Sequence, residues 1–324
     1  MTSTLRAVLA ALVLLALGGL IGVARWQARR GDDSPAVPAA WNSPEDCRPC
    51  HAEVYGEWEA SGHRRAWDDP NVQASFQHFG FDRKCESCHA PEPVLVTGLV
   101  APAALREADR GGGVTCLSCH LLPDGRGVAA SRTAADARCR PTQTPALGQP
   151  RLCGVCHTAI YQDWQERPAG LEPRSCRDCH MPAVSTRLGG RSHVCLGGHH
   201  AETVRSAAEV RCRSEAGELA VTVANRAAGH NFPGERHHRL LILEVLQRNA
   251  AGEITLVRQE SIKGITPFRG ESSAEQIRAG QSSELRFPVP QAGTARVRLL
   301  YKLFPWLSDN EALVVHEEEV KLEK

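Results

Sequence analysis

Five motifs of the form C-x-x-C-H are the residues of this sequence best suited to carry chemistry. They use ten of the thirteen cysteines. In such a motif, two thiols can form thioethers with the vinyl groups of a porphyrin, and the adjacent histidine can ligate the iron. We therefore predict five covalently bound haems c, attached through Cys47, Cys50, Cys85, Cys88, Cys116, Cys119, Cys153, Cys156, Cys176 and Cys179. The predicted proximal iron ligands are His51, His89, His120, His157 and His180.

Other uses of paired cysteines fit the pattern less well. A zinc ribbon takes four ligands from two cysteine pairs and gives no reason for a histidine after every second cysteine. A thioredoxin-like redox motif normally occurs once, and a disulfide framework would not repeat a histidine at a fixed offset. The repeated motif therefore favours haem attachment over zinc binding and over thiol redox chemistry.

The second axial position of each iron usually takes histidine or methionine. The only methionines are Met1 and Met181, and Met181 adjoins His180, so it cannot reach the opposite side of the same haem. Histidine is left as the main supply. Among the nine histidines outside the motifs, we predict distal ligands at His63, His78, His193, His199 and His230. The sequence leaves open which of them serves which haem, and we expect structural or exposed roles for His200, His237, His238 and His316.

Three cysteines lie outside the motifs: Cys139, Cys195 and Cys212. In an oxidising compartment, two of them are expected to form a disulfide, which would leave one thiol over. A thiolate ligand to iron is the alternative use of Cys195.

The amino terminus predicts the cellular compartment. Residues 7–24 form an unbroken apolar run, which as a helix nearly spans a hydrocarbon core of about 30 Å. We interpret the run as a membrane anchor, with a cleaved signal peptide as the alternative. Arg25, Arg29 and Arg30 follow it, a charge bias that argues against export of the carboxyl side. The haem motifs outweigh this bias, because bacterial haem attachment occurs outside the cytoplasmic membrane, and we expect the rest of the chain in the periplasm.

Composition limits the partners and the core. The net charge is +1, with 38 basic and 37 acidic residues, and indicates neither nucleic acid nor an acidic lipid surface as a partner. Residues 47–200 hold all five motifs, which leaves roughly 31 residues for each haem, fewer than the ~40 below which a domain usually needs a metal, a disulfide or a partner. The porphyrins are therefore expected to form the core of this region and to lie close together.

The chain is predicted to have four parts. Residues 1–30 contain the anchor or signal peptide, and residues 31–44, which are rich in proline and alanine, form a linker. Residues 45–211 form a pentahaem domain, and residues 212–324 form a second domain without a redox centre of its own. The predicted fold class is α+β.

Local patterns predict the elements of both domains. Few breakers occur in residues 52–66 and 158–166, where we expect helices, whereas prolines and glycines make residues 91–114 and 122–151 loops. Several apolar stretches of strand length, separated by turn residues, predict a β-sandwich in the second domain. The expected strands lie at residues 219–224, 239–246, 254–257, 284–289 and 295–301.

The chain resembles the multihaem cytochromes related to hydroxylamine oxidoreductase, its tetrahaem electron acceptor and pentahaem nitrite reductase. The resemblance covers residues 44–240 and rests on four features: the first motif with Trp58, Ser61 and His63; Gly113-Val-Thr before the third motif; Met181-Pro after the fifth; and Gly229-His-Asn-Phe-Pro-Gly. The C-x-x-C-Lys site of the nitrite reductases is absent from this chain. The fourth motif keeps Tyr161 and Trp164, but no histidine follows where the first motif has His63.

Two functions are compatible with these features. The first is an electron carrier that connects periplasmic or membrane redox proteins, such as a quinol oxidase and a terminal reductase. The second is an enzyme that acts on a small nitrogen or sulfur species at one five-coordinate haem. The supply of histidines and the absence of C-x-x-C-Lys favour the carrier. If one haem is open, the haem at His157 is the expected site.

Overall fold

The computed structural model describes residues 36–78, 80–81, 83–171, 174–185, 190–234, 239–261 and 276–323. The chain divides into two compact units, residues 1–38 and residues 39–324. The predicted anchor at residues 7–24 and the start of the predicted linker lie outside the described residues. Within the described ranges, no helix combines the length and the apolar character that crossing a membrane requires.

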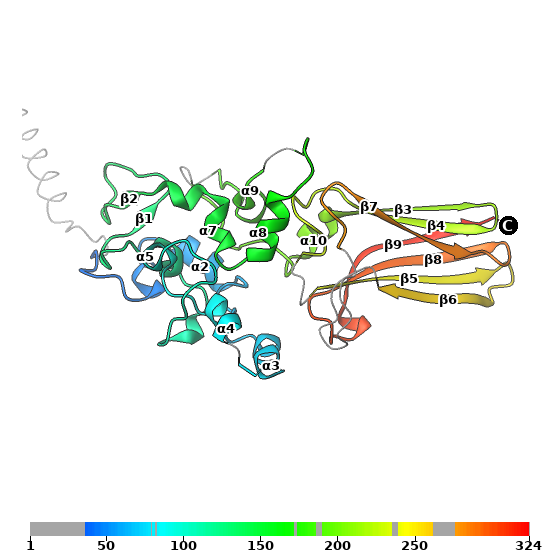
Figure 1. The fold of residues 1–324 in the computed structure, drawn as a ribbon, viewed down its shortest axis with the longest axis horizontal. Helices are drawn as coiled ribbons and strands as arrows, with labels where there is room; N and C mark the ends of the chain where they lie inside the picture. The colour runs from blue at the N-terminus through cyan, green and yellow to red at the C-terminus, as the bar shows by residue number, and fades with distance from the viewer. Residues whose placement is uncertain are drawn as a thin grey trace, which may run out of the picture. The chain divides into compact units, whose positions relative to one another are not determined.

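The region of the five motifs consists of short helices joined by long connections (Figure 1). The longest helix that the structure describes here has nine residues. The α-helices are α2 (Ala52–Glu59), α3 (Pro70–His78), α4 (Arg83–His89), α5 (Val94–Thr97), α6 (Cys116–His120), α7 (Pro150–Gly154), α8 (Thr158–Gln165), α9 (Cys176–His180) and α10 (Ala201–Ala207). Between them lie the 3-10 turns η1 (Pro44–Asp46), η2 (Arg110–Gly112) and η3 (Pro145–Gly148), and two short parallel strands, β1 (Ala129–Ala130) and β2 (Thr142–Gln143).

The predicted helix at residues 52–66 is shorter than expected, because α2 ends at Glu59. Turns follow it, and the carbonyl oxygen of His63 accepts the backbone N–H of Val114 at 2.9 Å. Gly113 makes this approach possible, since its φ is +63° and a Cβ there would collide with the same carbonyl. A backbone contact from a distant segment therefore replaces the helical continuation.

The segments predicted as loops also differ in part from the structure. Residues 91–114 contain α5 and η2, and residues 122–151 contain β1, β2, η3 and the start of α7. These elements have between two and five residues, so their sequences are too short to show a helical or strand period. The prediction at residues 158–166 agrees with α8 to within one residue.

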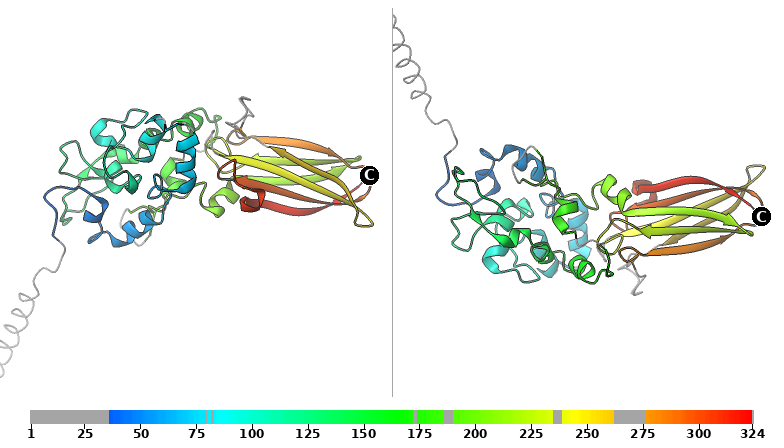
Figure 2. Two further views of the ribbon diagram at one scale, coloured as in Figure 1. Left: turned by 90° about the horizontal axis from the view of Figure 1, so that it is seen from below. Right: turned by 90° about the horizontal axis from the view of Figure 1, so that it is seen from above.

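The carboxyl-terminal part consists of two antiparallel sheets. Strands β3 (Ala208–Glu215), β4 (Glu218–Asn225) and β7 (Ser282–Pro288) form one sheet in the order β3-β4-β7. Strands β5 (Leu240–Asn249), β6 (Ile254–Ser261), β8 (Gly293–Lys302) and β9 (Leu313–Leu322) form the other, in the order β6-β5-β8-β9, and the turn η4 (Asp309–Glu311) precedes β9. The strands of the two sheets lie in two layers (Figure 2).

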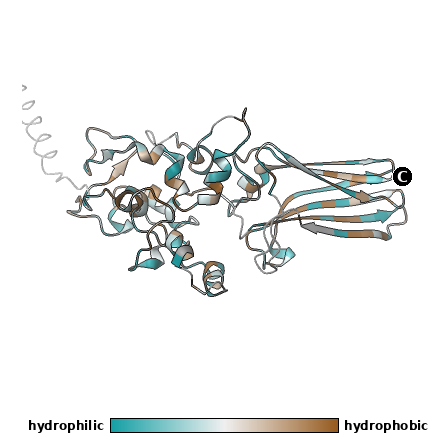
Figure 3. Cartoon of the chain, viewed as in Figure 1, coloured by the Kyte–Doolittle hydropathy of each residue, from teal (hydrophilic) through white to brown (hydrophobic). Residues whose placement is uncertain are grey.

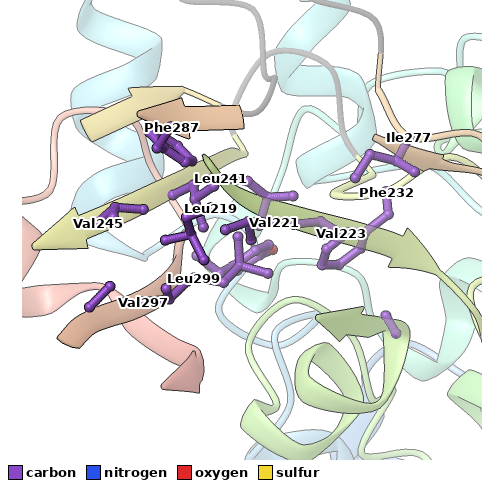
Figure 4. Packing of buried hydrophobic residues seen from close by; sticks show 14 of the residues in the cluster. Leu219, Val221, Val223, Phe232, Leu241, Val245, Ile277, Phe287, Val297 and Leu299 are labelled. Atoms are coloured by element: carbon purple, nitrogen blue, oxygen red, sulfur yellow. The ribbon is translucent and has the colours of Figure 1, made fainter. Parts of the chain in front are cut away.

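One hydrophobic core joins the two sheets. Alternate residues of β4, including Leu219, Val221 and Val223, are buried together with Leu241 and Leu299 of the other sheet (Figure 4). Hydrophobic and hydrophilic residues alternate along these strands (Figure 3), as expected for strands with one face on a core. The region of the motifs has a much smaller apolar cluster, formed by Val94, Ala103 and Val155. Its polypeptide therefore buries little apolar surface by itself.

All five predicted strands are present, and sequence reasoning missed two more, β3 and β9. Charged residues on the outward faces hide the apolar alternation of both: β3 reads AEVRCRSE and β9 reads LVVHEEEVKL. The predicted domain boundary between residues 211 and 212 falls inside β3, which begins at Ala208 directly after α10.

Candidate haem-binding sites

Each C-x-x-C-H motif forms one turn of helix, which brings its three functional residues to one side. The third and fifth motifs are the helices α6 and α9 themselves, and the second closes α4. In the first and fourth motifs, the backbone N–H of the histidine donates to the carbonyl of the first cysteine at 2.9 Å, and the histidine is the N-cap residue of the next helix. Local capping supports the turns: Thr115 and Ser118 exchange hydrogen bonds at the start of α6.

Three of the five motif histidines face a predicted distal histidine. The ring centroids are 6.3 Å apart for His63 and His157, 6.2 Å for His120 and His193, and 6.2 Å for His180 and His230. Two imidazoles on opposite sides of one metal ion have centroids roughly 6 Å apart, because each metal–nitrogen bond is about 2.0 Å long and each centroid lies ~1 Å beyond its nitrogen. The three separations fit one iron atom between each pair of rings.

Hydrogen bonds to backbone carbonyls orient these rings. The Nδ1 atom of His120 lies 2.7 Å from the carbonyl oxygen of Ala129, and the Nδ1 atoms of His193 and His230 lie 2.9 and 2.8 Å from carbonyl oxygens of their own loops. His180 makes the same contact with Leu196, and His89 makes it with Ala66. A neutral imidazole that donates from Nδ1 keeps its lone pair on Nε2, the atom that then binds a metal.

Burial keeps several of these histidines neutral. It lowers the pKa of His63 from 6.5 to about 4, with a further contribution from the charge of His157. Burial is also the main cause of the lowered pKa values of His120 and His230. Only the neutral imidazole can ligate a metal, so these rings are in the required form at neutral pH.

The motif cysteines of different haem sites lie against one another. The thiols of Cys47 and Cys116 are hydrogen-bonded, which places the first motif beside the third. Two more thiol pairs join the fourth motif to the fifth, through Cys153 and Cys176, and to the second, through Cys156 and Cys88. The thiol of Cys119, whose pKa burial raises to about 11, also acts electrostatically on Cys153 and Cys156. The five motifs thus form one connected cluster.

The loop that carries His230 follows β4 and is tied to both parts of the chain. The side-chain amide of Asn225 donates to the carbonyl oxygens of His230 at 2.8 Å and of Ile277 at 3.0 Å, which fixes the loop to the sheets. On its other side, Gly229 lies against the indole of Trp164 in α8. A histidine from the sheet domain is thereby held opposite the fifth motif.

The other predicted distal ligands are placed less completely. The ring of His199 packs against the backbone at Gly62, and its pKa is lowered by burial and then by the charges of Arg239 and Arg65. His78 is the last residue of α3, but its side chain lies outside the described residues. The same holds for His237 and His238.

The two remaining histidines have partners of their own. The Nδ1 atom of His200 accepts the backbone N–H of Thr203 and caps α10, and His316 lies 3.2 Å from a carboxylate oxygen of Glu318. Both contacts are structural, in keeping with the roles expected for these two residues.

The disulfide expected among the three extra cysteines is absent, because Cys139, Cys195 and Cys212 form no disulfide bond. The three thiols lie in separate places. Cys139 is near Cys50 and Cys47, Cys195 is near Cys119 and Glu57, and Cys212 is hydrogen-bonded to Glu318 in the sheet domain.

Sequence reasoning missed the contacts that position the distal histidines. The backbone N–H of His193 donates to a carboxylate oxygen of Glu57 at 2.8 Å, which ties the His193 loop to α2. The indole N–H of Trp58 donates to the carbonyl of Val114 at 2.8 Å and holds the segment before the third motif. Trp58 was part of the family resemblance, but no sequence signal pointed to Glu57.

Comparisons with known proteins agree with this description. Residues 46–121, which hold the first three motifs, match the family "Cytochrome c554 and c-prime". No curated protein matches the chain by sequence. A penta-heme cytochrome c552 from Thermochromatium tepidum is similar in structure, with a TM-score of 0.64, 18% identity, and coverage of 87% of this chain and 99% of that one. A superoxide reductase from Nanoarchaeum equitans also matches. The aligned part is 36% of this chain and 91% of the reductase, at 12% identity, but the TM-score of 0.23 is too low to indicate a shared fold.

Residues 46–121 thus match a cytochrome c family, and the chain shares the fold of a penta-heme cytochrome; both findings agree with haem attachment at the C-x-x-C-H motifs.

Proposed function

We propose that the chain carries electrons through five covalently bound haems c, most of them ligated by two histidines. The three histidine pairs with centroids 6.2 to 6.3 Å apart carry this proposal. The five C-x-x-C-H motifs supply the count, and the similar cytochrome from Thermochromatium tepidum is itself described as penta-heme.

The geometry supports an assignment of three distal ligands. His63 serves the haem of the fourth motif, His193 that of the third, and His230 that of the fifth. The fourth haem was the expected site if one haem is open, and the ring of His63 opposite His157 argues against an open position there. For the haem at His89, the candidate distal ligands are His78 and His199. The ring of His89 is hydrogen-bonded to the carbonyl oxygen of Ala66, and the neighbouring Arg65 acts electrostatically on His199, so His89 and His199 both lie near residues 65–66.

The cysteine contacts support a continuous path. A bound c-type haem supplies reversible one-electron transfer at its iron. Thiol contacts join the first motif to the third, the fourth to the fifth and the fourth to the second, and the thiol of Cys119 in the third motif acts electrostatically on Cys153 and Cys156 in the fourth. Such close attachment points leave no room for polypeptide between neighbouring porphyrin edges, and this arrangement suits transfer along the chain.

The sheet domain contributes a ligand instead of a redox centre. No C-x-x-C-H motif occurs in residues 212–324. His230 nevertheless stands opposite His180, so the loop after β4 closes the fifth haem. The iron would then join the two domains through one bond.

The setting of this activity follows from the chemistry of attachment. We place the chain in the periplasm, anchored by residues 7–24 or released if that segment is cleaved. Its partners would be periplasmic or membrane redox proteins, such as a quinol oxidase as donor and a terminal reductase as acceptor. The near-balanced charge gives no support for a nucleic-acid partner.

Two measurements on the haem-loaded protein test the proposal. Intact mass after acid-acetone extraction should show five haem additions, and four or fewer in a preparation where control cytochromes fill completely would contradict the count. Electron paramagnetic resonance of the oxidised protein should show mostly low-spin iron. A dominant high-spin signal would instead favour an enzyme with open haems.

A further inference from the structure

The second motif encloses a buried charge. Ten residues, all of which the structure describes, stand between the paired cysteines of the five motifs, and Glu86 is the one that is both charged and buried, with an exposed fraction of 6%. Its side chain forms an ion pair with Arg110, whose Nη1 atom lies 3.8 Å from a carboxylate oxygen of Glu86. A buried carboxylate needs such a partner, because removing a charge from water is costly. The pair joins the second motif to the turn η2, which precedes the third motif.

Aromatic rings connect Arg110 to the histidine of the same motif. The guanidinium lies over the ring of Trp67, 5.3 Å from its centroid, and Trp67 packs against Phe76 with the ring centroids 5.3 Å apart. Phe76 is buried and meets the ring of His89 edge to face, with the centroids 5.1 Å apart. The carbonyl oxygen of Ala66, the residue before Trp67, lies 2.5 Å from the Nδ1 atom of His89. Arg110 therefore belongs to the packing around the proposed iron ligand.

The backbone that follows the second motif holds Arg110 in place. The Nε atom of Arg110 donates to the carbonyl oxygen of Arg106 at 3.2 Å, and the backbone N–H of Arg106 donates to the carbonyl oxygen of Ala90 at 2.8 Å. Ala90 follows His89 directly and is fully buried. The guanidinium is thereby fixed beside Glu86 by contacts at both ends of the motif.

The other charges paired with Arg110 lie at the surface. Arg110 also forms an ion pair with Glu107, and Glu107 forms one with Arg83. The side chains of Glu107 and Arg83 are 61% and 67% exposed, so water and salt screen their charges. The buried carboxylate of Glu86 is screened far less. Its charge, and the charge of the guanidinium that neutralises it, therefore act most strongly on the interior of the motif.

We propose that the ion pair of Glu86 and Arg110 sets the reduction potential of the haem iron held by His89. This inference rests on the proposed function, because it requires a haem at the second motif. Ferric haem carries one more positive charge than ferrous haem, so a nearby carboxylate stabilises the ferric state and a nearby guanidinium destabilises it. Neutralisation of Glu86 by Arg110 keeps the potential higher than a lone carboxylate would. Since the second motif contacts the fourth through Cys88 and Cys156, this potential governs how readily the second haem accepts an electron from its neighbour.

The test compares the full-length haem-loaded protein with Arg110→Gln, Glu86→Gln and the double variant, each in a redox titration followed by absorbance. Arg110→Gln leaves the buried carboxylate without its partner, and one of the five potentials should fall. Glu86→Gln removes the negative charge and keeps the shape of the side chain, and the same potential should rise. The double variant should return towards the wild type, because both charges are removed together.

Three controls separate charge from structure. Arg110→Lys keeps the positive charge but loses the planar group that lies on Trp67, and its potential should stay closer to the wild type than that of Arg110→Gln. Arg83→Gln removes an exposed arginine of α4 and should shift the potentials least. The variants are also made in a chain that lacks the second haem, through Cys85→Ser and Cys88→Ser. The shifts should vanish there.

The outcomes separate this inference from the proposed function. If the two single variants shift the potential in the same direction, or no further than Arg83→Gln does, the inference fails, while the carrier function stands. Shifts that persist without the second haem would place the effect at another haem and overturn the inference equally. If Arg110→Gln does not fold, the rise expected for Glu86→Gln decides alone. If the wild-type peptide that contains Cys85 and Cys88 shows no haem by mass, the proposed count of five fails together with this inference.

Discussion

Replacement of His230 by alanine tests the connection between the sheet domain and the haem cluster. The ring of His230 lies 6.2 Å from that of His180, with the two planes inclined by 18°. Its Nδ1 atom is bonded to the carbonyl oxygen of Asn231, and its loop is fixed by Asn225. The substitution removes one ring and leaves the anchoring of the loop to the sheets in place, because that anchoring uses backbone carbonyls.

The size of the effect follows from the number of sites and from burial. One haem of five should change from low spin to high spin, so the low-spin signal should fall by about one fifth. The truncation itself should cost less than the about 2–5 kcal/mol lost with a fully buried apolar side chain, because the ring of His230 is polar and only partly buried, and the lost iron–histidine bond adds to this cost. This loss should fall on the attachment between the domains, since His230 is not part of the hydrophobic core of the sheets. The sheets should keep their own cooperative unfolding.

Three assays measure these effects on the haem-loaded variant. Spin state by paramagnetic resonance and carbon monoxide binding after reduction should each report one altered haem, and limited proteolysis should cleave faster between the domains. The matched control is His316→Ala, which removes another sheet-domain histidine whose partner is Glu318. If His230→Ala keeps the wild-type spin state and binds no carbon monoxide, the assignment of His230 to the fifth haem is wrong.

Three further predictions concern the positions of the other ligands. Gly113→Ala should destabilise the fold more than Gly125→Ala. Both glycines have a positive φ, +63° and +68°, but a Cβ at Gly113 would collide with the carbonyl oxygen of His63, whereas a Cβ at Gly125 would meet open space. Equal shifts of the thermal unfolding temperature in the two variants would refute this reasoning. Acid should release His63 from its haem only below about pH 4: burial alone lowers the pKa of its ring from 6.5 to about 4, and an iron bound at Nε2 would lower it further, so the stability from this group, complete above pH 6.5, is lost as pH falls below about 4. A pH titration followed by spin state should show that loss, and a His63→Ala variant should lack it. Glu57→Gln should weaken the ligation by His193, because the carboxylate of Glu57 accepts the backbone N–H of His193. The high-spin fraction of the third haem should therefore rise in this variant. The control Glu59→Gln should leave the spin state unchanged.

The sequence predicted those features whose signal is local. The motifs contain their own geometry, because the spacing of two cysteines and a histidine matches one helical turn. The strands around Val221 and Leu243 were found because their apolar residues alternate or run together. Strand β9 was missed because four charged or polar residues in a row, His316 to Glu319, hide its inward-facing apolar positions. The early end of α2 was missed because its cause, the contact between His63 and Val114, joins segments far apart in the chain.

The pairing of ligands could not be predicted for the same reason. His63, His193 and His230 come from three separate segments; His63 and His193 each face the histidine of a motif other than the nearest one in sequence, and His230 reaches the fifth motif from the sheet domain. Such pairing closes long loops, at an entropic cost that the small apolar cluster of Val94, Ala103 and Val155 does little to offset. Under the proposed ligation, iron–histidine bonds would supply much of the stabilisation of this region. It follows that haem attachment and folding should be coupled: loss of one distal histidine should disturb the segment that carries it as well as the iron that it faces.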